Sequence, residues 1–194
     1  MTPQRHFKLA LLGFGNVGQA LAQLLLRKRD DIQAQYGITF SVTGIATGRH
    51  GRAVEVEGLD VQAALDLVAA GEPLTALSKV ETADVPAFLR ACAADVLFES
   101  IPVNYQDGQP AVDYIRFALE NGMHVATANK GPVVHAYRPL TELARRVGKR
   151  FYFESAVMDG APVFGLFRET LPAAHIRRVH GVLNSTTNLI LTRM

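Results

Sequence analysis

Residues 7–18, with the sequence FKLALLGFGNVG, decide the fold class of this chain. The apolar run FKLALL has the length of a buried strand, and it stops at Gly13. After the glycines, apolar residues recur every three or four positions, at Val17, Leu21 and Leu24 among others. That spacing lines one face of a helix. The stretch therefore predicts a strand, a tight glycine turn and a helix in direct succession.

The turn itself matches G-x-G-x-x-G, a pattern that binds the pyrophosphate of a dinucleotide when a strand precedes it and a helix follows. In such a turn Gly13 allows the sharp bend, Gly15 lets the pyrophosphate approach the backbone, and Gly18 permits close helix–strand packing. The N–H groups at the start of the helix point toward the phosphates. A turn that only links strand and helix is the alternative. The predicted cofactor residues here are Gly13, Phe14, Gly15, Asn16, Val17 and Gly18.

Strands and helices continue to alternate along the chain. Further strands are predicted at 40–46, 95–99, 123–127 and 151–154, and helices at 16–29, 61–69, 85–93, 110–120 and 139–147. This alternation is typical of parallel strands joined by helical crossovers, so we expect an α/β fold with a doubly wound parallel sheet, the Rossmann fold.

The order of predicted elements changes after Ser155. A helix is expected at 161–170, a strand at 176–183 and another helix at 186–193. We assign residues 1–150 to a dinucleotide-binding domain and residues 151–194 to the beginning of an incomplete α+β substrate domain. One strand between two helices cannot bury both of its faces, and its open edge favours a homodimer or another assembly partner.

The end of the second predicted strand bears on the choice between NAD and NADP. An NAD site usually has Asp or Glu at this point, to bind the ribose 2′-hydroxyl. No carboxylate occurs between Gly37 and Val54, whereas Thr47 and Arg49, with Arg52 as a further candidate, can bind a 2′-phosphate. The alternative is that the arginines are solvated loop charges. We expect NADP, with NAD as the alternative cofactor.

Two other strand ends carry candidate site residues, because ligands of open parallel sheets bind at the carboxyl ends of strands. Ser100 follows strand 95–99, and Lys130 follows strand 123–127. A lysine there can orient a substrate or transfer a proton, although an ordinary surface lysine is the alternative. The run NSTTN at 184–188 begins a predicted helix, either as a helix cap or as a set of groups for a substrate carboxylate.

Composition excludes several classes of protein. The 194 residues are 48% hydrophobic and 20% charged, unlike a disordered tail or a coiled coil. The net charge of +2 comes from interspersed charges, which argues against nucleic acid as a partner. Cys92 is the single cysteine and the histidines lack metal-ligand spacing, so we expect a reducing compartment and no transition-metal site. No apolar stretch suits a membrane span or signal peptide, which favours the cytoplasm.

Five segments resemble homoserine dehydrogenases, in that family's order and approximate spacing. They are GFGNVG at 13–18, DVLFESIPVN at 95–104, AVDYIRFALENGMHVATANKGPV at 111–133, FESAVMDGAPVFGLFRETLP at 153–172 and GVLNSTTNLILTRM at 181–194. The resemblance is weakest over residues 28–94, and ANKGP together with the last two segments is its most specific part. Members of this family reduce aspartate 4-semialdehyde to homoserine with NAD(P)H, on the route to threonine and methionine.

The resemblance implies roles for particular residues. Ser100 and Ile101 lie beside the nicotinamide, and Lys130 lies near both cofactor and substrate. A Na⁺ site is implied at the backbone carbonyls of Glu154, Val157, Asp159 and Ala161, although Met158 and Asp159 replace the small residues often found there. The implied substrate residues are Asn184, Ser185 and Thr186.

One departure from the family affects the expected activity. The family's acidic substrate ligands and its second, catalytic lysine lie downstream of the NSTTN helix, beyond the residues present here. We therefore expect NADPH binding with very slow turnover. The alternatives are a non-catalytic NADP-binding or regulatory module, and another NADP-dependent dehydrogenase of a small substrate.

Overall fold

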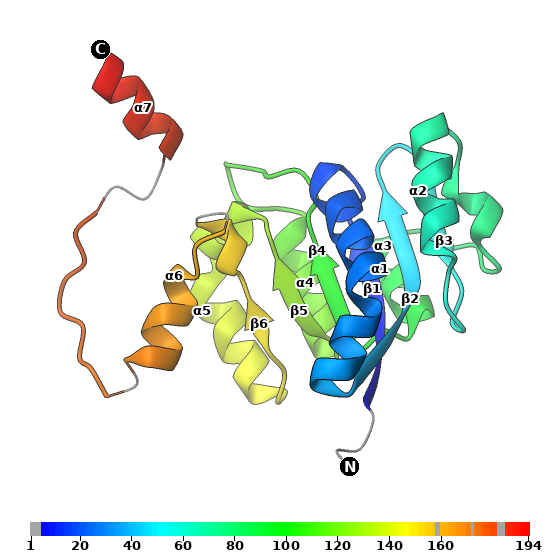
Figure 1. The fold of residues 1–194 in the computed structure, drawn as a ribbon, viewed down its shortest axis with the longest axis horizontal. Helices are drawn as coiled ribbons and strands as arrows, with labels where there is room; N and C mark the ends of the chain where they lie inside the picture. The colour runs from blue at the N-terminus through cyan, green and yellow to red at the C-terminus, as the bar shows by residue number, and fades with distance from the viewer. Residues whose placement is uncertain (1–4, 158–159, 172, 182–184) are drawn as a thin grey trace.

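A computed structural model describes residues 5–157, 160–171, 173–181 and 185–194 of the chain. Its centre is a six-stranded sheet with the strand order β3-β2-β1-β4-β5-β6 (Figure 1). The strands are β1 (Arg5–Leu12), β2 (Ile38–Thr47), β3 (Gly51–Val54), β4 (Val96–Glu99), β5 (His124–Thr127) and β6 (Phe151–Tyr152). All neighbouring strands are parallel except β2 and β3, which are antiparallel. The expected doubly wound α/β sheet is confirmed.

The helices cover both faces of this sheet. They are α1 (Asn16–Tyr36), α2 (Val61–Ala70), α3 (Val85–Cys92), α4 (Ala111–Glu120) and α5 (Lys130–Arg146), with a 3₁₀ turn η1 (Leu74–Leu77) after α2. The chain continues as η2 (Glu154–Ala156), α6 (Val163–Gly165), η3 (Leu166–Thr170) and α7 (Ser185–Arg193).

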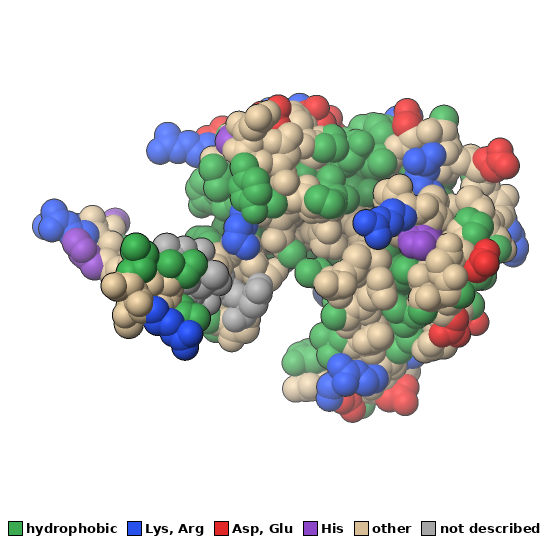
Figure 2. Space-filling view, turned by 90° about the horizontal axis from the view of Figure 1, so that it is seen from above, with side chains coloured by type: hydrophobic (Ala, Val, Ile, Leu, Met, Phe, Trp, Pro, Cys, Tyr) green, Lys and Arg blue, Asp and Glu red, His purple; other side chains and the backbone are tan. Residues whose placement is uncertain are grey.

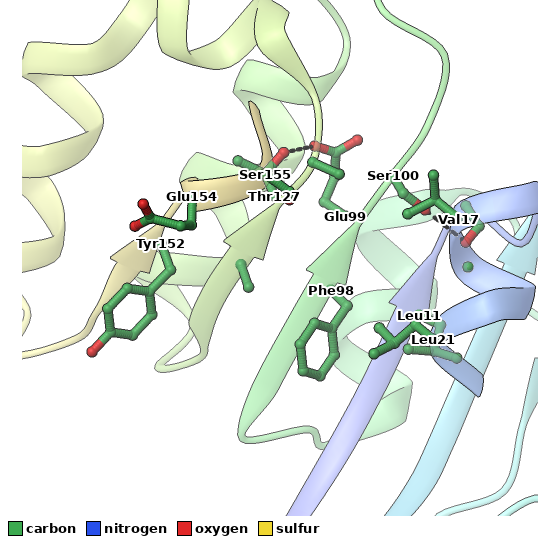
Figure 3. Close-up of a pocket in the computed structure, with 14 residues that line it drawn as sticks. Leu11, Val17, Leu21, Phe98, Glu99, Ser100, Thr127, Tyr152, Glu154 and Ser155 are labelled. Carbon is green, nitrogen blue, oxygen red and sulfur yellow. Dashed lines mark hydrogen bonds between the residues drawn. The ribbon is translucent and has the colours of Figure 1, made fainter. Parts of the chain in front are cut away.

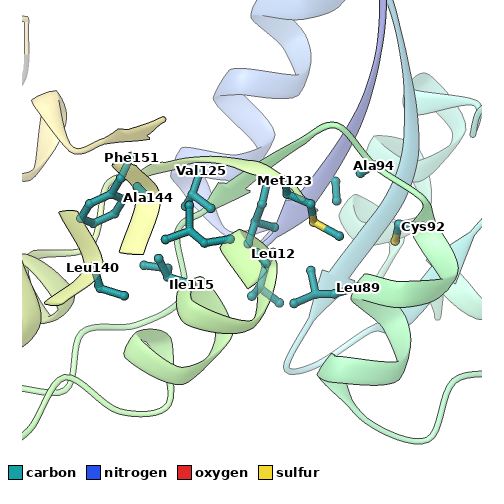
Figure 4. Close-up of a cluster of buried hydrophobic side chains, with 14 of the residues drawn as sticks. Leu12, Leu89, Cys92, Ala94, Ile115, Met123, Val125, Leu140, Ala144 and Phe151 are labelled. Carbon is teal, nitrogen blue, oxygen red and sulfur yellow. The ribbon is translucent and has the colours of Figure 1, made fainter. Parts of the chain in front are cut away.

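Two hydrophobic clusters lie on opposite faces, and β1 contributes alternate side chains to them. Leu9 and Leu11 belong to the cluster beneath α1 and α2. Leu12 belongs to the other cluster, with Ile115 of α4 and Leu140 of α5 (Figure 4). Successive strand residues point to opposite faces, so burial of both faces explains why residues 9–12 at the end of β1 are all apolar.

Helix α1 is longer than the sequence predicts. It was expected to end near residue 29 but continues to Tyr36, where Gly37 adopts a left-handed conformation with φ +64° and donates its N–H to the Gln33 carbonyl. A glycine in this conformation is a common helix terminator. The predicted end rested on the basic residues 27–29, but such residues are also compatible with a helix interior.

Helix α5 begins earlier than predicted, at Lys130 instead of residue 139. Its backbone departs from helical geometry at Ala136, where φ is −139°. Pro139 follows three residues later and cannot donate to the carbonyl of residue 135, so a kink at this point is expected. The sequence pattern indicated only the part of the helix after the kink.

The region after residue 160 differs most from expectation. The strand predicted at 176–183 is wrong over the described residues 176–181, which form no strand, and residues 182 and 183 lie outside the described residues. None of residues 160–171, 173–181 and 188–194 is buried. In Figures 1 and 2 much of this segment, including α7, stands apart from the sheet. In the described parts of the chain, no helix is long and apolar enough to cross a membrane.

Candidate functional site

The glycine turn lies between β1 and α1, at the carboxyl edge of the sheet. Gly13 has a φ of +101°, and a Cβ added there would lie 2.6 Å from the carbonyl carbon of Ser100. A Cβ on Gly18 would lie 2.2 Å from the Gly13 carbonyl oxygen. Both positions therefore require glycine for packing. Gly15 has no atom within 4 Å of such a Cβ, so the space beside it is open to a ligand.

The N-terminus of α1 has no side-chain cap, because Gly15 occupies the N-cap position. Asn16 and Val17, the first two residues of this 21-residue helix, are exposed. The free N–H groups and the positive end of the helix dipole therefore face the open space beside Gly15, an arrangement that binds phosphate.

Three clefts surround the turn. The largest, the β2 cleft of about 780 Å³, lies at the ends of β2 and β3. The β5 cleft of about 280 Å³ lies at the ends of β4 and β5 (Figure 3). The Lys130 cleft of about 230 Å³ adjoins it, at the start of α5. All three open at the edge where an open parallel sheet binds ligands.

Thr47 and Arg52 line the β2 cleft. Thr47 Oγ1 accepts N–H groups from Arg49 at 3.1 Å and His50 at 2.7 Å. Arg52 donates through Nε to Thr82 Oγ1 at 3.0 Å, and through Nη2 to the Thr82 carbonyl at 2.5 Å. Its guanidinium is thus anchored at the cleft, whereas Arg49 is exposed and is not among the lining residues.

The far wall of the β2 cleft is a segment that the sequence pattern did not indicate. It contributes Thr75, Ser78, Glu81 and Thr82. No helical or strand periodicity marks this segment, although its polar composition is a usable signal. Glu81 matters most, because a carboxylate lines the cleft although none occurs at the end of β2.

The β5 cleft contains a buried carboxyl group, Glu99, which is 1% exposed. Thr127 Oγ1 donates to Glu99 Oε2 at 2.5 Å, as Figure 3 shows. The Ile101 N–H donates to Glu99 Oε1 at 2.8 Å, and Asn129 Nδ2 donates to the same oxygen at 3.3 Å. Burial raises the pKa of Glu99 above its ordinary value, and the hydrogen bonds from Thr127, Ile101 and Asn129 oppose that rise.

The structure brings Ser100 and Lys130 together from different strand ends. Both line the Lys130 cleft, together with Ile101. Ser100 Oγ donates to the Gly13 carbonyl at 3.1 Å, which links this loop to the glycine turn. Lys130 is exposed at the first position of α5.

The structure describes the expected substrate residues only in part. Asn184 lies outside the described residues, and Ser185 and Thr186 begin α7, which stands apart from the sheet in Figure 1. The side chains of Ser185 and Thr186 likewise lie outside the described part of the structure.

The expected Na⁺ site is described only in part. Asp159 lies outside the described residues, and the Ala161 carbonyl accepts the Val163 N–H at 2.9 Å. Glu154 and Val157 lie in or next to η2, and the Glu154 carboxylate accepts the Phe164 N–H at 2.7 Å. Within the described residues, no group of three or more His, Cys, Asp or Glu side chains is arranged to hold a metal ion.

Two family models match the chain in succession. The model described as homoserine dehydrogenase, NAD binding domain, matches residues 13–154, and the model described as homoserine dehydrogenase matches residues 162–194. The chain belongs to the homoserine dehydrogenase family. The first match contains the glycine turn and most of the residues that line the three clefts.

Known homoserine dehydrogenases are similar over almost the whole chain. The NAD(+)-dependent homoserine dehydrogenase of Pseudomonas canavaninivorans is 37% identical over 97% of this chain and 54% of the relative. The homoserine dehydrogenase of Methanocaldococcus jannaschii is 34% identical over 96% of this chain and 55% of the relative. A hyperthermophilic archaeal homoserine dehydrogenase solved in complex with NADPH has a TM-score of 0.81 at 27% identity, over 97% of this chain and 56% of that one. The chain thus spans about half the length of these relatives.

Proposed function

We propose that this chain is the cofactor-binding part of a homoserine dehydrogenase and that it binds NADP(H). The decisive observation is the glycine turn, whose open side at Gly15 faces the uncapped N-terminus of α1. The family match over 13–154 and the archaeal relative bound to NADPH support this cofactor. The family assignment supports reduction of aspartate 4-semialdehyde to homoserine as the reaction of the whole enzyme.

The order of the strands supports one orientation of the cofactor. With the pyrophosphate at the glycine turn, the adenosine half would occupy the β2 cleft, beside Thr47 and Arg52. The nicotinamide half would then lie on the other side of β1, beside Ser100 and Ile101. NADP is preferred because Arg52 provides a fixed positive charge for a 2′-phosphate. Glu81 in the same cleft keeps NAD as the alternative, since a carboxylate can accept from the ribose hydroxyls.

The proposed roles in the reaction are few. When bound, the cofactor supplies a hydride to the aldehyde carbon, and the carbonyl oxygen must gain a proton to give the alcohol. Lys130 lies at the mouth of the same cleft as Ser100, where it holds a proton close to that oxygen and orients the substrate. The backbone Na⁺ site at residues 154–161 remains a prediction.

The residues beyond 160 favour a second candidate, a module that binds NADP without catalysis. The described part of this segment is not buried, and α7 stands apart from the clefts. Such a module binds NADPH with an affinity that homoserine does not change. A dehydrogenase site binds NADPH more tightly in the presence of homoserine, which distinguishes the two candidates.

We also propose that the protein acts in the cytoplasm as a homodimer. The single cysteine, Cys92, is buried and has no partner for an internal disulfide, which suits a reducing compartment. Exposed apolar side chains such as Ile176, Val179 and Ile190 offer a surface for a second copy.

Paired arginine variants test the cofactor preference. In Arg52→Leu, NADPH affinity should fall about tenfold because a charge-assisted hydrogen bond to the 2′-phosphate is lost, while NADH affinity stays unchanged. Titration calorimetry with both cofactors measures this. Arg49→Leu is the matched control on the same turn. Equal losses for NADPH and NADH in Arg52→Leu would show that Arg52 only holds the Thr82 segment, and a larger loss in Arg49→Leu would assign the 2′-phosphate to Arg49.

A further inference from the structure

Glu99 is the most deeply buried acidic side chain near the proposed cofactor site. It ends β4, with 1% of its surface exposed, and none of the salt bridges within the described residues involves it. Burying a carboxyl group is costly unless hydrogen bonds compensate. An apolar residue would fill this position in a strand at lower cost, so the donors around Glu99 must account for its presence.

Two of those donors are distant from Glu99 in sequence. Thr127 ends the next strand, β5, and Asn129 follows it, 28 and 30 residues away from Glu99. The Ile101 N–H belongs to the loop beside the glycine turn. The carboxyl group therefore links three segments: the end of β4, the end of β5, and the loop at Ile101 that lies beside the glycine turn.

Asn129 carries this link to the start of α5. Its Oδ1 accepts the Gly131 N–H at 3.0 Å and caps the helix, and its Nδ2 donates to the Ile101 carbonyl as well as to Glu99. The Asn129 N–H donates to Thr127 Oγ1 at 2.9 Å. Lys130, the residue between Asn129 and Gly131, is thus attached to a backbone whose position depends on this network.

The other end of the network reaches the glycine turn. Ser100 stands between Glu99 and Ile101, and its hydroxyl donates to the Gly13 carbonyl while its N–H donates to the Leu12 carbonyl at 2.8 Å. Glu99 therefore fixes both walls of the space assigned to the nicotinamide: the Ser100–Ile101 loop and the N-terminus of α5.

The geometry points to Glu99 as a positioning residue for the nicotinamide half of the cofactor, acting through Ile101 and Asn129 and, by way of Asn129, on Lys130. This inference rests on the proposed function. Glu99 itself does not line the β2 cleft, although its partner Ile101 does. The inference therefore assigns Glu99 a larger effect on the nicotinamide half than on the adenosine half.

The test compares two ligands in the full 194-residue chain. NADPH occupies both halves of the site, whereas adenosine 2′,5′-bisphosphate occupies only the adenosine half. Glu99→Gln keeps the size of the side chain but presents an amide N–H₂ where one carboxyl oxygen accepted. Calorimetry should show NADPH affinity lowered about tenfold and bisphosphate affinity lowered much less. Glu142→Gln, which removes an exposed charge from α5 outside the network, should change neither affinity.

A second pair protects the test if Glu99→Gln folds poorly. Thr127→Val removes the hydroxyl between Glu99 and the Asn129 N–H and should show the same selective loss, and Thr127→Ser should restore it. Equal loss of both ligands would indicate a purely structural role and overturn the inference, as would no loss of NADPH. If the unaltered chain binds the bisphosphate and NADPH, the proposed cofactor function stands even when the inference fails. If it binds neither, the proposed function fails as well.

Discussion

The sheet region, residues 5–157, and the C-terminal segment, residues 160–194, are similar in apolar content but differ in what their apolar residues contact. Leu97 of β4 is 0% exposed, whereas Leu191 of α7 is 67% exposed. In the sheet region two clusters bury both faces of a parallel sheet. The clefts around the glycine turn all open on this region. The packed sheet therefore holds the proposed cofactor site in place, and residues 160–171, 173–181 and 188–194 add no buried residue to it.

The largest expected effect is a contrast between leucines of the two regions. Leu97→Ala should lower the free energy of unfolding by about 2–5 kcal/mol, because it removes contacts from a fully buried side chain. Leu191→Ala should change it by less than about 0.5 kcal/mol, since the side chain is exposed. Urea unfolding followed by circular dichroism measures both. Similar losses in the two variants would break the comparison.

A smaller effect is expected at a close contact inside the sheet region. A Cβ on Gly44 of β2 would lie 2.0 Å from Cys92 Sγ and 3.0 Å from the Phe88 ring. Gly44→Ala should therefore cost about 1–3 kcal/mol of stability through overpacking. Gly48→Ala, where no atom lies within 4 Å of the added Cβ, is the matched control. Equal melting temperatures for the two variants would contradict the close packing of α3 on β2.

The smallest predicted effect is a pH dependence that arises from Cys92. Burial raises the pKa of its thiol from 9.0 to about 12. Between pH 9 and pH 12 the unfolded chain loses this proton and the folded chain keeps it, so stability is full below pH 9 and falls as the pH rises. From pH 8 to pH 10 the loss should be about 1 kcal/mol. In Cys92→Ala, the decrease in the free energy of unfolding between pH 8 and pH 10 should be smaller by that amount. Urea unfolding at both pH values measures it. An identical decrease in the unaltered chain and in Cys92→Ala would indicate that the thiol is accessible to solvent.

Local patterns were sufficient to predict most of the sheet region. The FKLALL run, the glycine turn and the Asn121-Gly122 end of α4 each carry their own signal over a few residues. The strand β3 was missed because the four residues GRAV are too few to show a period. Residues 176–181 were misjudged, because their β-branched residues Ile176 and Val179 favour a strand only where a neighbouring strand can pair with it.

Site residues could be predicted from the sequence only where a single short segment determines their role. The roles of Gly13 and Gly18 in packing follow from the motif, and the structure gives their close contacts. Glu99 was not predicted as a site residue, because its partners Thr127 and Asn129 come together with it only through the pairing of β4 with β5. Arg52 likewise gains its fixed position from Thr82, 30 residues away.

Titration of the purified chain with NADPH and NADH, followed by nicotinamide fluorescence, tests most directly whether the sheet region holds the cofactor site. The chain should bind NADPH saturably and more tightly than NADH. Gly15→Ala should weaken NADPH binding without changing the melting temperature, because its added methyl group meets only the space open to a ligand. Failure of the unaltered chain to bind either cofactor, or equal NADPH binding by Gly15→Ala, would contradict a cofactor site at the glycine turn.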